Sequence, residues 1–84
     1  MVEDLVMGEK MSIGDYGEIS FTIKKRRKYP IPGDPFIIQG YVMTAEVIDL
    51  DNRNVLIRDN DGIEYLTSKG RIRNFSPMPK PVLQ

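Results

Sequence analysis

The sequence predicts an all-β fold, and three features of the chain indicate it. Residues 18–24 alternate between polar and apolar side chains, which is the period of a strand with one buried face. Residues 36–48 are rich in Ile, Tyr, Val and Thr, which favour strands. Asp59-Asn60-Asp61-Gly62 is a hairpin signal, because Asn and Gly tolerate the positive φ that such turns require.

Each expected strand follows from a local pattern. In the first, Ile19, Phe21 and Ile23 share the apolar side. The second is one long strand or two strands bent at Gly40, since a glycine in a strand marks a bulge or a bend. The remaining three are short, and Ser68-Lys69-Gly70 links the last two. The expected strands lie near residues 18–24, 36–48, 54–58, 63–67 and 71–75.

The segment between the first two strands is predicted to be a loop. Five consecutive basic residues, Lys24 to Lys28, lead into residues 29–35, which hold three prolines and a glycine. Proline fits neither a helix interior nor the interior of a strand ladder. We therefore expect a long basic loop that ends near Pro35.

One domain, residues 16–76, is expected between two extensions. Residues 1–15 form an N-terminal arm or a short helical turn, and residues 77–84 a proline-rich extended tail. At 84 residues the chain is close to the lower limit for an independent core. The expected interior consists of Ile19, Phe21, Ile23, Val42 or Met43, Val47, Leu56, Ile63 or Tyr65, Ile72 and Phe75.

In the order of its strands and loops, the chain resembles the SH3-like small β-barrel over residues 16–76. Lys25 to Pro35 takes the place of the long first loop, and Asp59 to Gly62 that of the tight distal turn. The resemblance implies a single closed five-stranded barrel. It brings no binding motif, because the acidic first loop, paired tryptophan and proline-binding tyrosines of peptide-binding SH3 domains are absent. A five-stranded OB-like barrel is the alternative.

The composition argues against most catalytic and metal chemistry. With no cysteine and no histidine, the chain lacks thiolate nucleophiles, the usual general base and the commonest metal ligands. Asp49, Asp51, Asp59 and Asp61 do not fit a calcium loop, since position 12 counted from Asp49 is Asn60. They are interpreted as turn residues. We expect a protein that is not an enzyme and has no metal and no cofactor.

Charge is separated along a chain whose formal net charge is zero. Residues 24–28 carry five bases, whereas residues 29–64 carry seven acids against two bases. Zero net charge argues against indiscriminate binding to nucleic acid or anionic lipid and favours a specific complementary partner. The longest apolar runs are three residues, too short to span a membrane, so cytoplasmic residence is the default expectation.

The functional hypothesis is a non-catalytic protein-interaction module, an accessory or regulatory subunit that binds a partner through the basic loop 24–35. The alternative is nucleic-acid binding through the same loop, with aromatic stacking. A third interpretation gives the lysines no binding role and has them protect a solvated strand edge. The sequence does not indicate the oligomeric state. The candidate binding residues are Lys24, Lys25, Arg26, Arg27, Lys28, Tyr29, Phe36, Arg71 and Arg73, with Tyr41 as a further stacking candidate.

Overall fold

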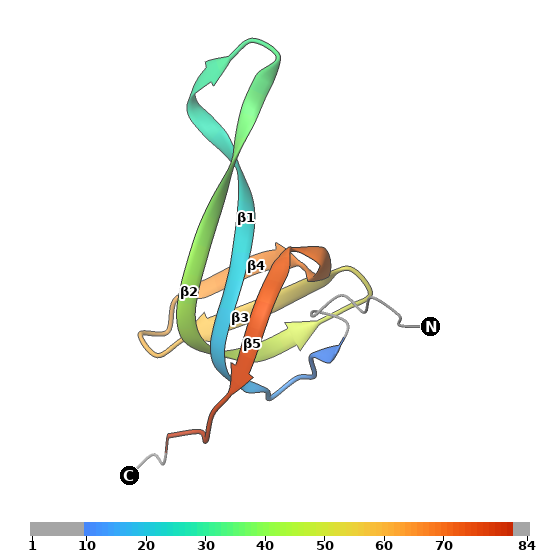
Figure 1. The fold of residues 1–84 in the computed structure, drawn as a ribbon, viewed down its shortest axis with the longest axis vertical. Helices are drawn as coiled ribbons and strands as arrows, with labels where there is room; N and C mark the ends of the chain where they lie inside the picture. The colour runs from blue at the N-terminus through green and yellow to red at the C-terminus, as the bar shows by residue number, and fades with distance from the viewer. Residues whose placement is uncertain (1–9, 82–84) are drawn as a thin grey trace.

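The computed structural model describes residues 10–81, which form one antiparallel sheet of five strands in the order β4-β3-β2-β1-β5 (Figure 1). This confirms the all-β prediction, because the assigned elements are five strands and one short 3-10 turn between β4 and β5. The elements are β1 Tyr16–Ile31, β2 Asp34–Leu50, β3 Asn54–Asp59, β4 Glu64–Ser68, the 3-10 turn η2 Lys69–Arg71, and β5 Ile72–Pro77.

The first two strands extend far beyond the rest of the sheet. β1 pairs with β2 from Tyr16 opposite Glu46 to Arg26 opposite Phe36. β5 pairs with β1 only over residues 17–21, and β3 pairs with β2 only over residues 45–50. Residues 22–42, here called the hairpin arm, therefore project as a two-stranded ribbon, along the longest axis of the molecule in Figure 1.

The predicted loop over Lys25–Pro35 is wrong, because this segment is the outer half of the hairpin arm. β1 continues to Ile31, β2 begins at Asp34, and Pro32 and Gly33 connect them. Gly33 has a φ of 84°, and proline followed by a positive-φ glycine is the combination of a type II turn. The prolines are tolerated because neither β1 nor β2 has a second neighbouring strand within the arm, so a missing N–H on the outer side need not break a ladder.

The core lies where β1, β2, β3 and β5 overlap. Ile19, Phe21, Val47 and Ile72 are buried as predicted. The prediction left two pairs of alternatives open. Met43 and Tyr65 pack against the core, whereas Val42 and Ile63 are exposed. Ile23 and Phe75 also pack against the core. The buried apolar residues not predicted are Met11, Ala45, Val55 and Ile57, and the polar Thr67 is buried as well.

The prediction for Leu56 is wrong by one position in β3. Val55 and Ile57 are fully buried, and Leu56 lies on the opposite face. Side chains alternate along a strand, so a shift of one residue exchanges the two faces. Three consecutive apolar residues do not show which of them point inward.

The segments that flank the predicted domain partly join the sheet. Asp15 and Val47 continue the β1–β2 pairing, since the Val47 N–H donates to the Asp15 carbonyl over 2.8 Å. After β5, the Met78 N–H donates to the Tyr16 carbonyl over 3.0 Å, and Lys80 Nζ lies 3.0 Å from Glu46 Oε2. The expected N-terminal turn falls largely on residues 1–9, which lie outside the described residues, as do residues 82–84.

The sheet ends in two edge strands, β4 and β5. It curls enough for the Thr67 hydroxyl, on β4, to donate a hydrogen bond to the Thr22 carbonyl, on β1, over 2.6 Å. Over residues 10–81 no strand ladder joins β4 to β1 or to β5. Closure into a barrel is therefore still a prediction.

Candidate functional site

The root of the hairpin arm is fixed by three aromatic rings. Phe21 stacks on Tyr41 with ring centroids 5.3 Å apart, and Tyr65 of β4 lies against both rings. Burial, followed by the nearby Asp59 carboxylate, raises the pKa of Tyr65. The Tyr65 hydroxyl donates to Asp59 Oδ2 over 3.3 Å. The arm thus starts from a packed base, and Tyr41 belongs to that base.

The tip of the arm is held by Arg27. Its guanidinium donates to both the main-chain oxygen and the carboxylate of Asp34, over 2.9 and 2.8 Å. The β1–β2 register slips between Arg26 and Ile31, so these bonds bridge the irregular part of the ribbon. Arg27 was predicted as a binding cation, but its guanidinium is already hydrogen-bonded to Asp34 within the arm.

The other four basic residues of the run are exposed on β1: Lys24, Lys25, Arg26 and Lys28. Alternation along the strand places Lys24 and Arg26 on one face of the ribbon and Lys25 on the other. The arm is consequently basic on both faces of β1.

The aromatic side chains of the arm are partly covered by its own cations. Lys24 Nζ lies 4.5 Å from the centroid of the Phe36 ring, and the Arg26 guanidinium lies 5.5 Å from it. Tyr29, near the tip, is 78% exposed, with Lys28 Nζ 5.8 Å from its ring centroid. Of the predicted stacking residues, Tyr29 presents the most open ring.

The two C-terminal candidates, Arg71 and Arg73, separate in the structure. Arg71 lines a shallow hollow of about 220 Å³ together with Lys24, Ile23 and Leu66. Arg73 is exposed on β5, at the point where the β1–β5 register shifts between Ser20 and Phe21, and it does not line this hollow. The structure thus brings Arg71 to the root of the arm, whereas Arg73 lies on β5 outside this hollow.

The exposed apolar side chains of the arm were not predicted as binding residues. Ile31, at the end of the basic strand β1, and Phe36, Ile37, Ile38 and Val42, on the neighbouring β2, are all exposed. The available signal was Phe36-Ile37-Ile38, three consecutive apolar residues on a strand that can bury only every second one. In a ribbon without a second layer, both faces of this run remain accessible.

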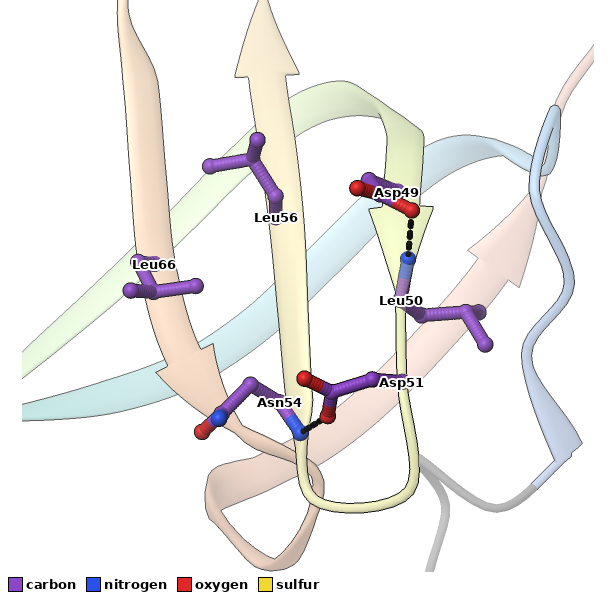
Figure 2. A pocket seen from close by; sticks show the side chains of 6 residues that line it. All are labelled: Asp49, Leu50, Asp51, Asn54, Leu56 and Leu66. Atoms are coloured by element: carbon purple, nitrogen blue, oxygen red, sulfur yellow. Dashed lines mark hydrogen bonds between the residues drawn. The ribbon is translucent and has the colours of Figure 1, made fainter.

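In the acidic β2–β3 turn, a carboxylate holds the backbone. A shallow hollow of about 180 Å³ lies beside the β2–β3 turn. Figure 2 shows the side chains that line it, with Leu56 and Leu66 on neighbouring strands. Asp51 Oδ1 accepts the N–H groups of Arg53 and Asn54 over 2.8 and 2.7 Å, and these hydrogen bonds lower the pKa of Asp51. No cluster of three potential metal ligands occurs in residues 10–81.

At the β3–β4 turn, the prediction that the aspartates shape the hairpin is confirmed for Asp59. Its Oδ1 accepts the N–H groups of Asp61 and Ile63, each over 2.9 Å, and Gly62 takes a φ of 83°. Both acidic turns therefore use a carboxylate to hold the backbone, which agrees with the role of Asp side chains in turns.

Comparison of the chain with protein-family models, curated proteins and solved structures finds no match. Within the described residues, no helix has the length and apolar character needed to cross a membrane.

Proposed function

We propose that this chain is a non-catalytic protein-interaction module, an accessory or regulatory subunit that binds a partner protein through the hairpin arm. The observation that carries the proposal is the surface of the arm, which exposes apolar side chains from Ile31 to Val42 next to four exposed cations. An isolated two-stranded ribbon is marginal in water. Apolar surface concentrated on such an element marks an interaction site.

A protein partner fits this surface better than a nucleic acid. The Phe36 ring already contacts Lys24 and Arg26, and Tyr41 is stacked on Phe21, so stacking of a base would compete with these contacts. The exposed isoleucines have no role in binding phosphates, whereas apolar anchors with a charged surround are typical of protein interfaces.

Two isoleucines of nearly equal exposure provide a matched test. Ile38 on the arm is 52% exposed, and Ile63 in the β3–β4 turn is 53% exposed. The wild-type chain and Ile63→Ser are expected to capture the same protein from an extract of the source cells, and Ile38→Ser is expected to lose it. Circular dichroism verifies that both variants fold. If Ile38→Ser captured the protein as well as wild type does, the proposal that the arm is the binding element would be wrong.

Nucleic-acid binding is the second candidate, favoured by the run of five basic residues and the open ring of Tyr29. It is tested by titrating labelled single- and double-stranded oligonucleotides at low and at moderate salt. Four phosphate contacts, one for each exposed cation of the run, predict a log-log salt slope of roughly −2.8 to −3.6. Under the protein-partner proposal no binding is expected at low salt, and a slope of that size would favour the nucleic acid.

A further inference from the structure

The outer edge of β1 has open backbone groups within the hairpin arm. The Tyr16 carbonyl accepts from Met78, beyond β5, and the Thr22 carbonyl accepts from Thr67, so both point away from β2. Backbone groups alternate in direction along an antiparallel strand, which places the N–H and C=O of Lys24 and Arg26 on the same outer edge. Among residues 10–81 these groups have no strand partner.

The structure leaves space beside this edge. β5 pairs with β1 only as far as Phe21, and the chain then turns away through η2. The hollow lined by Lys24, Ile23, Leu66 and Arg71 opens next to the position where the pairing stops. An extended segment that continues along β1 beyond Thr22 would lie over this hollow. Its lining is mixed, with apolar Ile23 and Leu66, the polar side chains of Asn54, Thr67 and Ser68, and the cations Lys24 and Arg71.

Charge determines which segment this edge accepts. Lys24, Lys25, Arg26 and Lys28 are exposed along it, and Arg71 adds a fifth positive charge beside the hollow. Like charges on neighbouring strands repel, and lysines on an edge are a known obstacle to pairing between identical chains. The same lysines attract an acidic strand. The outer edge of β2 has no such charges, since residues 36–42 contain no charged side chain.

We propose that an extended acidic segment of the partner protein adds to the sheet at the β1 edge, beside Lys24 and Arg26. This inference rests on the proposed function and specifies how the arm binds. The segment exchanges backbone hydrogen bonds with the N–H and C=O of Lys24 and Arg26, as in other cases of strand addition. Its carboxylates meet Lys24 and Arg26 on one face and Lys25 on the other.

The test uses a short capped peptide in which Val and Glu alternate, titrated against the full chain. One control peptide replaces each Glu with Lys. The other keeps the Val–Glu sequence but carries an N-methyl group on every backbone amide, which keeps the charge and removes every N–H that a ladder needs. Only the unmodified Val–Glu peptide is expected to bind. It should also slow amide hydrogen exchange at Lys24 and Arg26. Binding of the N-methylated peptide with equal affinity would overturn the inference.

Two substitutions at Arg26 separate charge from hydrogen bonding. Arg26→Ala and Arg26→Pro both remove the guanidinium, but only Arg26→Pro removes the outward N–H. Arg26→Pro should bind the Val–Glu peptide about tenfold more weakly than Arg26→Ala. Gly40→Pro, which removes an outward N–H from the β2 edge, should leave the affinity unchanged. A larger loss in Gly40→Pro than in Arg26→Pro would assign the strand to β2 and overturn the proposal.

The remaining outcomes are also decisive. If Arg26→Pro does not fold, the amide exchange of the wild-type chain decides, and a lack of protection at Lys24 and Arg26 overturns the inference. Sedimentation should show a monomer without peptide. A dimer that the Val–Glu peptide dissociates would assign the edge to a second copy. Equal binding by Arg26→Ala and Arg26→Pro would reject strand addition but leave the proposed function intact, because the Ile38→Ser capture tests that separately.

Discussion

The Thr67 hydroxyl donates a hydrogen bond of 2.6 Å to the main-chain carbonyl of Thr22. This bond joins β4, at one edge of the sheet, to β1, which lies three positions away in the strand order. It occurs next to Phe21, where the pairing of β1 with β5 ends and the hairpin arm begins. The direction in which the arm leaves the sheet is thus tied to β4 by a buried side chain, since Thr67 is 6% exposed.

The two threonines of this contact should respond oppositely to the same substitution. Thr67→Val removes the donor and leaves the Thr22 carbonyl without it, which should lower the free energy of unfolding by about 1–2 kcal/mol. The Thr22 hydroxyl is itself buried without a hydrogen-bond partner, so Thr22→Val should be neutral or stabilising. Urea unfolding measures both variants. Equal destabilisation by the two would argue against this account of the contact.

Two glycines in strands should differ strongly in their tolerance of a methyl group. A Cβ on Gly17 would lie 2.1 Å from the Ser76 carbonyl oxygen, a backbone atom of β5, whereas a Cβ on Gly40 would meet nothing within 4 Å. Gly17→Ala should therefore destabilise the fold by roughly 2–3 kcal/mol or more, and Gly40→Ala should be neutral. Thermal unfolding gives the comparison, and a stable Gly17→Ala would contradict the close packing of β5 on β1.

Acid should weaken the fold through Asp51. The N–H groups of Arg53 and Asn54 lower its pKa below the ordinary value of 3.8, so the folded state binds the proton less tightly than the unfolded state. The contribution to stability is complete above the unfolded pKa and is lost as the pH falls through the lower, folded pKa. Asp51→Asn keeps an acceptor oxygen but does not titrate.

This prediction is tested by unfolding wild type and Asp51→Asn in urea over a series of pH values. The stability difference between them should be constant near neutral pH and should change progressively below about pH 4. Two curves that remain parallel through the acid range would show that Asp51 does not contribute in this way.

Arg27 should control the order of the arm tip without controlling global stability. Its ion pair with Asp34 is partly exposed, at 28% and 62%, and exposed pairs contribute about 0–1 kcal/mol. Arg27→Ala should therefore speed amide exchange near Pro32 and Gly33 while leaving the unfolding midpoint almost unchanged. Lys28→Ala, the neighbouring charge deletion, should leave the exchange rates as they are. If the two variants showed identical amide exchange near Pro32 and Gly33, Arg27 would not be the residue that orders the tip of the arm.

Much of the fold was predictable because local patterns determine it. The alternation around Phe21 gave the first strand, and the Asp59 to Gly62 turn gave the hairpin between β3 and β4. The length of β1 was not predictable in this way, since basic residues and prolines indicate a loop when each is considered alone. Their tolerance in β1 depends on having no second strand on its outer edge, which is a property of the assembled sheet.

The candidate site was predicted in part for the same reason. The run from Lys24 to Lys28 is local and could be identified. The hydrogen bond from Arg27 to Asp34 could not, because it forms only when the turn at Pro32 and Gly33 brings the two residues together. Likewise, Arg71 reaches the root of the arm only because the sheet curls. No pattern in the sequence separates it from Arg73.

The aromatic base of the arm gives the protein an intrinsic optical probe. The chain has no tryptophan and four tyrosines, and Tyr41 and Tyr65 sit with their ring centroids 5.5 Å apart where the arm meets the sheet. Ultraviolet absorbance and emission of the unlabelled chain therefore come from few chromophores, with two of them placed at this junction. A ligand that bends the arm at its root would change their signal directly, without any attached dye.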